Sequence, residues 1–318
     1  MTLPAALPVG IASRLRLPLI AAPMLHVSGP DLVTAACRAG VVGAFPTKNA
    51  RSSGELDAWL TDIRLRLADT DGRAAPFCPN LIMRDSRLAE DLACVVRHGA
   101  ELVITSVGSP APAVGALHDA GALVLADVAT LRHADRAIAA GADGLILLTA
   151  GAGGQTGWLN PFAFVRAVRR MFDGVVVLAG GVSDGQALAA ARLLGCDLAY
   201  MGTRFIATRE SLASDAYRSM LVDASMDDIL LTSSFTGLPA NMLAPSIAAA
   251  GLDPQRLDES MSEARSRAQF GAGADGPRRW TDIWSAGHSV SGVGEVQSVE
   301  ALVDCTAREF DAAMRGAG

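Results

Sequence analysis

The sequence predicts an α/β protein built on a (β/α)8 TIM barrel, with an inserted helical subdomain near the C-terminus. Eight short apolar runs recur along the first two thirds of the chain, and an amphipathic segment follows each of them. The runs are apolar throughout rather than alternating, as in parallel strands that are covered on both faces. Eight such units favour a closed barrel, because an open doubly wound sheet usually has fewer strands.

The eight runs are expected to be the barrel strands in chain order. They cover residues 17–24, 41–46, 76–83, 102–108, 122–129, 144–150, 175–182 and 198–205. Helices are expected between them, for example over 31–40, 53–70, 87–100, 131–142, 160–172 and 184–196. Several of these segments end in glycine, which commonly terminates a helix.

The regular alternation stops after the eighth run. We assign residues 1–208 to the barrel and expect the helix-rich stretch 209–275 to form an inserted lid. Residues 276–318 are expected to return to the barrel as a closing loop and a final helix near 298–314. In that loop Trp280 and Trp284 are four residues apart, which suits packing on one helical face.

Composition and charge exclude several classes of protein. Half of the 318 residues are hydrophobic, and the formal net charge is −6 with no dense basic run, so neither nucleic acid nor a membrane is an expected partner. Five scattered cysteines predict buried thiols of a cytoplasmic protein, and we expect no metal site. No export signal or bilayer-spanning run is visible. The expected partner is a small-molecule substrate, and a homodimer is left open.

Two glycine-bearing strand ends are consecutive in the sequence: AGGVSDG after the seventh run and MGTRF after the eighth. Active sites of (β/α)8 barrels lie where strands end and the following loops begin. Backbone N–H groups freed by glycine beside a helix N-terminus form an anion site. The residues predicted to hold a cofactor phosphate are therefore Gly180, Gly181, Gly202 and Thr203.

A third glycine-rich loop, TAGAGGQTG, follows the sixth run. Its spacing does not match the dinucleotide pattern G-x-G-x-x-G, and it lies in the middle of the chain, so we reject a Rossmann-type site. In a barrel loop, Gly153 and Gly154 would let the backbone approach a flat ligand while Gln155 projects into the cavity.

Over nearly the whole chain these motifs resemble those of the nitronate monooxygenases, formerly called 2-nitropropane dioxygenases. The resemblance is carried by AAPM, GAGGQTG, LAGGVSDG, MGTRFIAT, FTGLPANMLAPSI and WTDIWSAG. The family consists of FMN enzymes on a (β/α)8 barrel with a helical second domain. The resemblance implies that Ala22, Pro23 and Met24 lie against the flavin ring and that Asn80 bonds its polar edge.

The resemblance also bears on the fifth strand end and the closing loop. It implies that Asp127 lies near the flavin or its ribityl chain, although a carboxylate that caps the following helix is an equal alternative. The segment 284–290 resembles the family's loop over the flavin, so Ser285 and His288 could reach the ligand.

The sequence departs from the family pattern at Gln155. Members usually carry GGHxG, and the resemblance implies that this histidine is the general base for the carbon beside the nitro group. An amide cannot accept a proton near neutral pH. A nitronate is already an anion at carbon, so its oxidation with O2 to a carbonyl compound and nitrite survives the change. We therefore predict an FMN-dependent oxidoreductase that acts on alkyl nitronates and does not act on neutral nitroalkanes.

Two alternatives are left open. Relatives in the wider family are FMN-dependent reductases of quinones or enoyl thioesters, with NAD(P)H as reductant, and Gln155 could polarise the oxygen of such an activated alkene. A flavin-binding scaffold without activity is the other alternative.

Two further residues bear on the choice between these functions. His26 could replace the missing base or donate a proton, and Lys48 could attract an anionic substrate or a nicotinamide dinucleotide phosphate. A solvent-exposed histidine and a solvated lysine are the simpler interpretations.

Overall fold

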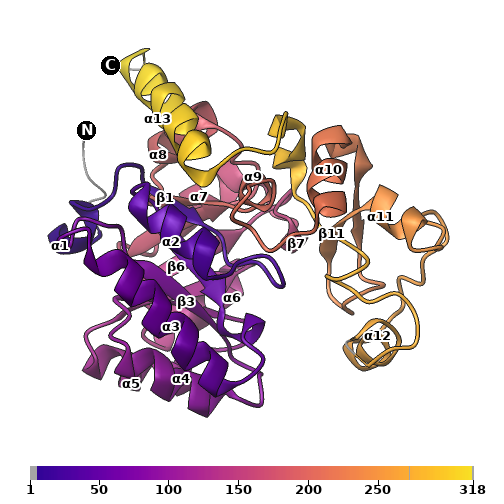
Figure 1. Cartoon of the computed structure of the whole chain (residues 1–318), viewed down its shortest axis with the longest axis horizontal. Helices are drawn as coiled ribbons and strands as arrows, with labels where there is room; N and C mark the ends of the chain where they lie inside the picture. Colours follow the sequence, from indigo (N-terminus) through magenta and orange to yellow (C-terminus); the bar gives the residue numbers. More distant parts are fainter. Residues whose placement is uncertain (1–5, 272, 317–318) are drawn as a thin grey trace.

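The computed structural model describes residues 6–271 and 273–316 and contains a closed barrel of eight parallel strands (Figure 1). The predicted (β/α)8 TIM barrel is therefore confirmed. In order around the barrel, the strands are β1 (Leu19–Ala21), β2 (Val42–Pro46), β3 (Phe77–Ile82), β4 (Leu102–Ser106), β5 (Leu123–Val128), β6 (Gly144–Leu148), β8 (Val175–Ala179) and β9 (Leu198–Met201), and β9 pairs with β1 to close the ring.

Helices cover the outside of the barrel, and capping side chains set several of their first residues. Ser52, Thr130, Asn160 and Asp184 each accept a hydrogen bond from a backbone N–H of the first turn. Among the described residues, no helix is both long and apolar enough to cross a bilayer. The outer helices are α2 (Pro30–Arg38), α3 (Ser53–Ala68), α4 (Leu88–Arg97), α5 (Ala111–Asp119), α6 (Leu131–Ala139), α7 (Pro161–Val168), α8 (Gly185–Leu194) and α13 (Val299–Gly316).

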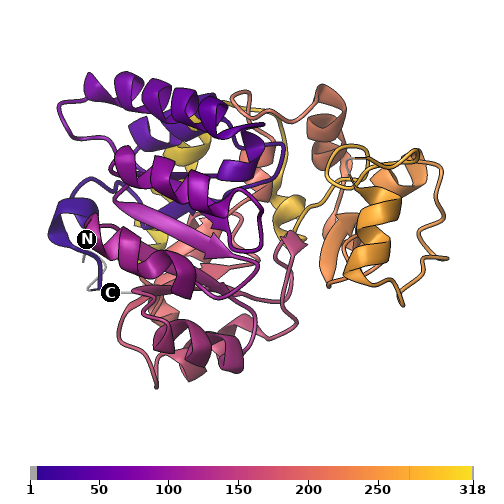
Figure 2. The ribbon, with the colours of Figure 1, turned by 90° about the horizontal axis from the view of Figure 1, so that it is seen from below.

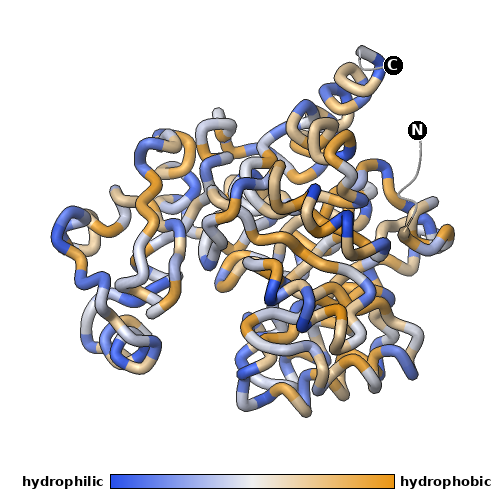
Figure 3. The backbone as a smooth tube through the Cα atoms, turned by 180° about the vertical axis from the view of Figure 1, so that it is seen from behind, coloured by the Kyte–Doolittle hydropathy of each residue, from blue (hydrophilic) through white to orange (hydrophobic). Residues whose placement is uncertain are grey.

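The apolar residues of the strands supply two layers of core. One set faces the barrel interior and continues onto the short helix α1 (Val9–Ala12) near the start of the chain. The other set packs under the outer helices, with α13 lying against α8. Figure 3 shows the resulting concentration of hydrophobic chain in the barrel. Burial on both faces explains why the strand sequences do not alternate.

A second lobe lies beside the barrel (Figures 1 and 2). Its elements are α10 (Asp215–Asp223), η2 (Met226–Asp228), β10 (Ile229–Thr232), β11 (Ala240–Leu243), α11 (Ala244–Ala249) and α12 (Glu263–Phe270). The stretch 209–275 is thus not wholly helical, because β10 and β11 form an antiparallel hairpin. The hairpin was not predicted from the sequence, because each of its strands has only four residues. Ile283 also belongs to the apolar core of the lobe, which therefore continues past residue 275.

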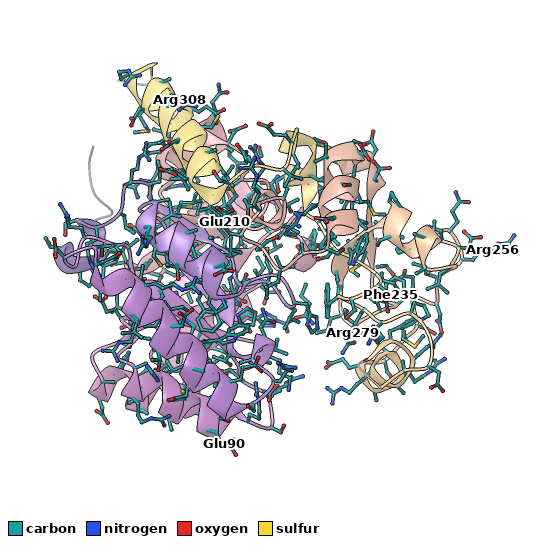
Figure 4. The ribbon with its side chains drawn as sticks, viewed as in Figure 1. Glu90, Glu210, Phe235, Arg256, Arg279 and Arg308 are labelled. Carbon is teal, nitrogen blue, oxygen red and sulfur yellow. The ribbon has the colours of Figure 1, made fainter. Side chains whose placement is uncertain are left out.

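Side-chain hydrogen bonds and a stacked pair of aromatic rings stabilise the lobe. The Nη1 of Arg279 donates to the carbonyl of Phe235 at 2.9 Å and to the hydroxyl of Ser266 at 3.1 Å, and Figure 4 shows Arg279 and Phe235 close to one another. The ring of Trp284 stacks on Tyr217 with centroids 4.9 Å apart. Trp280 has a φ of 68° and lies in a turn, so the expectation that the two tryptophans share a helical face was wrong.

Candidate active site

Four polar side chains line the C-terminal end of the barrel interior. Successive residues of a strand point to opposite faces. Cys78, Ile104, Leu125 and Leu198 belong to the core inside the barrel. Two positions further along the same strands, the chain places Asn80 on β3, Ser106 on β4, Asp127 on β5 and Tyr200 on β9. This is the end of the barrel where the loops of (β/α)8 enzymes carry their chemistry.

Asn80 and Ser106 hold each other in place. The Nδ2 of Asn80 donates to the Oγ of Ser106 at 3.1 Å, and the Ser106 hydroxyl lies 3.3 Å from the Oδ1 of Asn80. Both side chains are buried. The pair fixes the amide while its carbonyl oxygen keeps the capacity to accept another hydrogen bond.

Asp127 and Tyr200 carry buried polar atoms that have no partner in the part of the chain that the structure describes. Neither the Oδ1 of Asp127 nor the hydroxyl of Tyr200 makes a hydrogen bond to any described residue. Burial raises the pKa of Asp127 to about 7, and burial together with the nearby Asp127 raises the pKa of Tyr200 well above its ordinary value. Buried polar groups normally have partners, so these two atoms point to a polar ligand at the barrel mouth.

Asp127 does not cap the following helix. The N-cap of α6 is Thr130, whose Oγ1 accepts from the backbone N–H of His133 at 3.1 Å. The capping alternative for Asp127 was therefore wrong, because a threonine three residues later satisfies the helix N-terminus.

The end of β8 is a glycine turn that borders open space. Gly180 and Gly181 have φ values of 124° and 75°, which other residues rarely adopt. A Cβ on Gly180 would lie 2.6 Å from the Oγ1 of Thr149, whereas a Cβ on Gly181 would meet no protein atom within 4 Å. The backbone of Gly181 is thus accessible to a ligand just before the N-terminus of α8.

The end of β9 lies beside this turn, because β8 and β9 are neighbours in the barrel. Gly202 is followed by Thr203, the first residue of the short helix α9 (Thr203–Ile206). The buried Oγ1 of Thr203 accepts a hydrogen bond from the N–H of Gly287 at 2.9 Å. The Nη1 of Arg204 donates to the carbonyl of Ser183, which places a positive charge near the two glycine turns.

The segment after β1 borders the same region. A Cβ on Gly202 would lie 3.5 Å from the Sδ of Met24 and 3.7 Å from the Cβ of Ala22. Asn49 fixes the segment, since its Nδ2 donates to the carbonyl of Met24 at 2.9 Å. The structure therefore brings Ala22, Pro23 and Met24 next to the end of β9.

The glycine loop after β6 is held by the second lobe. Gly154 and Gln155 form a short strand, β7, which pairs with Asn241 and Ala240 of β11. The side-chain amide of Asn241 donates to the carbonyl of Ala152 at 2.7 Å. The loop containing the candidate catalytic amide is thus one strand of the three-stranded sheet β10–β11–β7.

The closing loop holds the glycine loop from another side. The N–H of His288, in η3 (His288–Gly292), donates to the carbonyl of Gly151 at 2.9 Å. A Cβ on Gly153 would lie 2.7 Å from the backbone nitrogen of Gly287, so glycine is required there for close packing. A Cβ on Gly154 would lie 3.9 Å from both the Ser285 hydroxyl and the Trp280 ring. Gln155 therefore lies where the barrel mouth meets the second lobe.

His26 and Lys48 lie on loops at the same end of the barrel, without hydrogen bonds to Gln155 or Asp127 among the described residues. His26 is exposed with a φ of 59°, and its N–H donates to Asn49. Surrounding protein atoms, and to a lesser extent the charge of Arg278, lower the pKa of His26, which favours the neutral imidazole. Lys48, in η1 (Thr47–Asn49), forms an ion pair with Asp85 at 2.8 Å.

Three residues of this region, Ser106, Tyr200 and Asn241, were not predicted from the sequence. Ser106 and Tyr200 follow the interior-facing positions of their strands by two residues, so the alternation of side chains could have identified them. Asn241 has no local signal, because its contact with Ala152 depends on the pairing of β11 with β7.

Comparisons with known proteins agree on the family and the fold. A family model described as nitronate monooxygenase matches residues 82–303. A nitronate monooxygenase of Paraburkholderia phytofirmans is 28% identical over 310 residues, covering 81% of this chain and 85% of the relative. The solved structure of a nitroalkane oxidase from Streptomyces ansochromogenes has the same fold, with a TM-score of 0.78, 24% identity and coverage of 97% of this chain and 100% of that chain.

A relative that is named for a different activity is comparably similar. It is the (3aS,4S,5R,7aS)-5-hydroxy-7a-methyl-1-oxo-octahydro-1H-indene-4-carboxyl-CoA dehydrogenase of Mycobacterium tuberculosis, 29% identical over 232 residues. The alignment covers 71% of this chain but only 62% of the length of that relative.

Proposed function

The chain belongs to the nitronate monooxygenase family, and we propose that it is an FMN-dependent oxidoreductase that oxidises alkyl nitronates with O2 to a carbonyl compound and nitrite. The observation that carries the proposal is the combination of a glycine turn open to a phosphate with unpaired polar atoms at the barrel mouth. Family membership supports the reaction class, and the replacement of the usual histidine by Gln155 restricts the substrate to the ionised form.

The residues of the barrel mouth suit FMN, which has a phosphate, a polar chain and a flat ring. The N–H groups around Gly180, Gly181, Gly202 and Thr203 and the N-terminus of α8 would bind the phosphate, with Arg204 offsetting its charge. Asp127 and Tyr200 each have a buried atom that lacks a partner among the described residues, as expected for groups that bind the polar chain or the ring edge.

The ring would lie over the segment after β1. Ala22, Pro23 and Met24 offer an apolar surface, and Asn80 retains hydrogen-bonding capacity beside it. Gly153 and Gly154 would let the backbone of the loop after β6 lie close to this ring. When bound, FMN supplies the electron-accepting centre that also reacts with oxygen.

Gln155 would orient the substrate rather than remove a proton from it. Its side-chain amide can donate hydrogen bonds to the nitronate oxygens, but it cannot take a proton from carbon near neutral pH. A nitronate already carries the negative charge that a base would create, so the reaction does not require one. The pairing of β7 with β11 holds this amide at the edge of the barrel mouth.

His26 and Lys48 are the other groups to which we assign roles. The lowered pKa of His26 keeps its imidazole neutral, so it can accept a proton at the rim of the site. Lys48 would attract the anionic substrate, although Asp85 offsets part of its charge. We expect both effects to be smaller than the effect of removing the glycine turn or Gln155.

A second candidate function is an FMN-dependent NAD(P)H reductase of a quinone or an activated alkene. The observation that favours it is Gln155, because a neutral donor can polarise a conjugated carbonyl. Similarity to a relative that is named as a dehydrogenase of a carboxyl-CoA compound agrees with this class. In this alternative, NAD(P)H would be consumed in a fixed ratio to the reduced substrate.

Oxygen uptake and nitrite release test the main proposal. Purified protein with bound FMN is mixed with propyl-2-nitronate, and with 2-nitropropane below its pKa as the matched neutral substrate. Each nitronate takes up one oxygen atom as it becomes a carbonyl compound and nitrite, so we expect two nitrite ions for each O2 consumed with the nitronate, and little of either with the nitroalkane. Equal rates with both substrates would contradict the assigned role of Gln155, and turnover with neither would contradict the proposed function.

A further inference from the structure

Three potential metal ligands meet on the outside of the barrel, where α3 packs against α4 (Figure 1). Cys94 and His98 are four residues apart at the end of α4 and therefore lie on one face. Asp57 faces them from α3. One ligand atom from each of the three lies within 4.8 Å of the others. We propose that Asp57, Cys94 and His98 bind one zinc ion.

Two of the distances between the ligand atoms are close to the edges of a zinc tetrahedron. With Zn–S about 2.3 Å and Zn–N or Zn–O about 2.0 Å, a tetrahedral site has a sulfur–oxygen edge of about 3.5 Å and a nitrogen–oxygen edge of about 3.3 Å. The Cys94 Sγ lies 3.7 Å from the Asp57 Oδ1, and the His98 Nε2 lies 3.0 Å from the same oxygen. The third edge, between the Cys94 Sγ and a ring nitrogen of His98, is no longer than 4.8 Å, so small side-chain rotations would bring the three atoms to one ion.

The donor set selects the metal. One thiolate, one imidazole and one carboxylate suit zinc, whereas magnesium and calcium prefer oxygen ligands alone. Cys94 is buried and the His98 side chain is 11% exposed, while the Asp57 side chain is 47% exposed. The fourth position consequently faces solvent on the Asp57 side, and a water molecule would complete the tetrahedron.

Arg97 competes with the metal for Asp57. Its Nη2 lies 2.9 Å from the Asp57 Oδ1, the oxygen that both other ligands also approach. The Arg97 side chain is 60% exposed, so it can swing into solvent when an ion takes its place. Exposed ion pairs are weak compared with a metal–ligand bond. Removing Arg97 should therefore strengthen metal binding, whereas a purely structural role for this ion pair predicts no such gain.

A second histidine–carboxylate pair in the chain offers a control for the proposed zinc site. The His118 Nε2 and the Asp143 Oδ2 lie 2.9 Å apart, and among the described residues no cysteine completes a ligand group with them. This pair resembles the proposed zinc site, because a histidine contacts a carboxylate and both side chains are partly exposed. A substitution of His118 is therefore the control for loss of a histidine–carboxylate contact without loss of the metal site.

The site is independent of the flavin function, because it lies between two outer helices and uses none of the residues assigned to FMN or substrate. Bound zinc would tie α3 to α4. It should raise the thermal stability of the flavin-loaded protein while leaving its visible flavin spectrum and its turnover unchanged.

Metal titration of the chelator-treated, flavin-loaded protein tests the proposal. Zinc is titrated by calorimetry, and cobalt is added separately to detect the near-ultraviolet absorption of a cobalt–thiolate bond. We expect one zinc per chain and this absorption in the wild type. Asp57→Asn and His98→Gln, which change partly exposed residues, should weaken zinc binding more than about 100-fold, beyond the effect of changing an outer-shell group. Arg97→Gln should tighten binding about two- to fivefold, which corresponds to the strength of an exposed ion pair.

Several results would overturn the zinc site. They are no zinc uptake by the wild type, cobalt uptake without the thiolate absorption, zinc affinity unchanged in both Asp57→Asn and His98→Gln, or an equal loss in His118→Gln. Cys94→Ser should abolish the cobalt–thiolate absorption. If that variant does not fold, the two partly exposed ligands and Arg97→Gln still decide the outcome.

Discussion

Gln155 pairs with Ala240 in the antiparallel register of β7 and β11, so the loop that carries the candidate catalytic amide is a strand of the second lobe's sheet. The neighbouring Asn241 strengthens this link by donating to the carbonyl of Ala152. The second lobe therefore sets the position of Gln155, the residue to which we assign the contact with the substrate.

We expect Asn241→Ala to loosen the catalytic loop. The substitution leaves the buried carbonyl of Ala152 without its partner, which costs about 1–3 kcal/mol of stability. Displacement of Gln155 should lower kcat/KM for propyl-2-nitronate about tenfold or more, while the FMN content changes little. Leu231→Ala, at an exposed position of β10, is the control and should leave kcat/KM unchanged. Equal kinetics in Asn241→Ala and the wild type would show that the Asn241 side chain does not position the loop.

Gln155→His should restore a base to the loop. Turnover of neutral nitroalkane is expected to rise by about 10²–10⁴, the usual contribution of a general base, and to increase with pH through the imidazole pKa near about 6.5. Turnover of the nitronate should change much less. Gln155→Asn retains an amide and should gain no nitroalkane activity. A pH-independent gain, or no gain with intact FMN binding, would place Gln155 away from the reacting carbon.

Gly181→Ala tests the phosphate site. Gly181 has a φ of 75° and open space around it, so alanine should cost about 1–2 kcal/mol of backbone strain and also fill the position next to the ligand. We expect reduced FMN content with a modest loss of thermal stability. Gly72→Ala is a close control, because Gly72 has a φ of 72°, is also surrounded by open space and lies outside the site. If both variants retain FMN equally, the phosphate does not bind at the end of β8.

Asp127 should make the stability of the flavin-free protein depend on pH. Its pKa is about 7 in the folded chain and about 3.9 in an unfolded one, so the folded state retains a proton that the unfolded state releases. Raising the pH between these values therefore favours unfolding, and the contribution of protonated Asp127 to stability is lost as the pH passes about 7.

Denaturant unfolding at pH 5 and pH 7.5 measures this effect. We expect the wild type to lose up to about 2–3 kcal/mol more than Asp127→Asn over this interval, because each unit of pKa corresponds to about 1.4 kcal/mol. Asp69→Asn changes an exposed carboxylate and serves as the control. Parallel behaviour of wild type and Asp127→Asn would mean that the carboxyl group is solvated in the folded protein.

The barrel could be predicted because its physical requirements are local. A strand buried on both faces must be apolar throughout, and the glycines at 180, 181 and 202 mark the turns that follow β8 and β9. Because the strand positions could be predicted from the local sequence, Asn80 and Asp127 could also be placed near the ends of their strands. Tyr200 was not predicted, because a tyrosine within an apolar run is usually interpreted as a residue of the hydrophobic core. In the structure, the Tyr200 hydroxyl has no partner among the described residues.

The features that could not be predicted depend on contacts between distant segments. β7 has only two residues and exists as a strand because β11 pairs with it. Trp280 follows a helical spacing in sequence, yet its N–H bonds to the carbonyl of Ile283 in a tight turn. Asp57 meets Cys94 and His98 only because α3 packs on α4, so the spacing of these residues gave no sign of a shared site.

Anaerobic mixing of the flavin-loaded protein with propyl-2-nitronate, and in parallel with NADPH and NADH, tests the proposed function most directly. The visible absorbance of the flavin is followed in each case. We expect rapid loss of this absorbance with the nitronate alone and none on the turnover timescale with either nicotinamide. Rapid bleaching by NADPH or NADH, with no response to the nitronate, would contradict nitronate oxidation and identify the protein as a reductase.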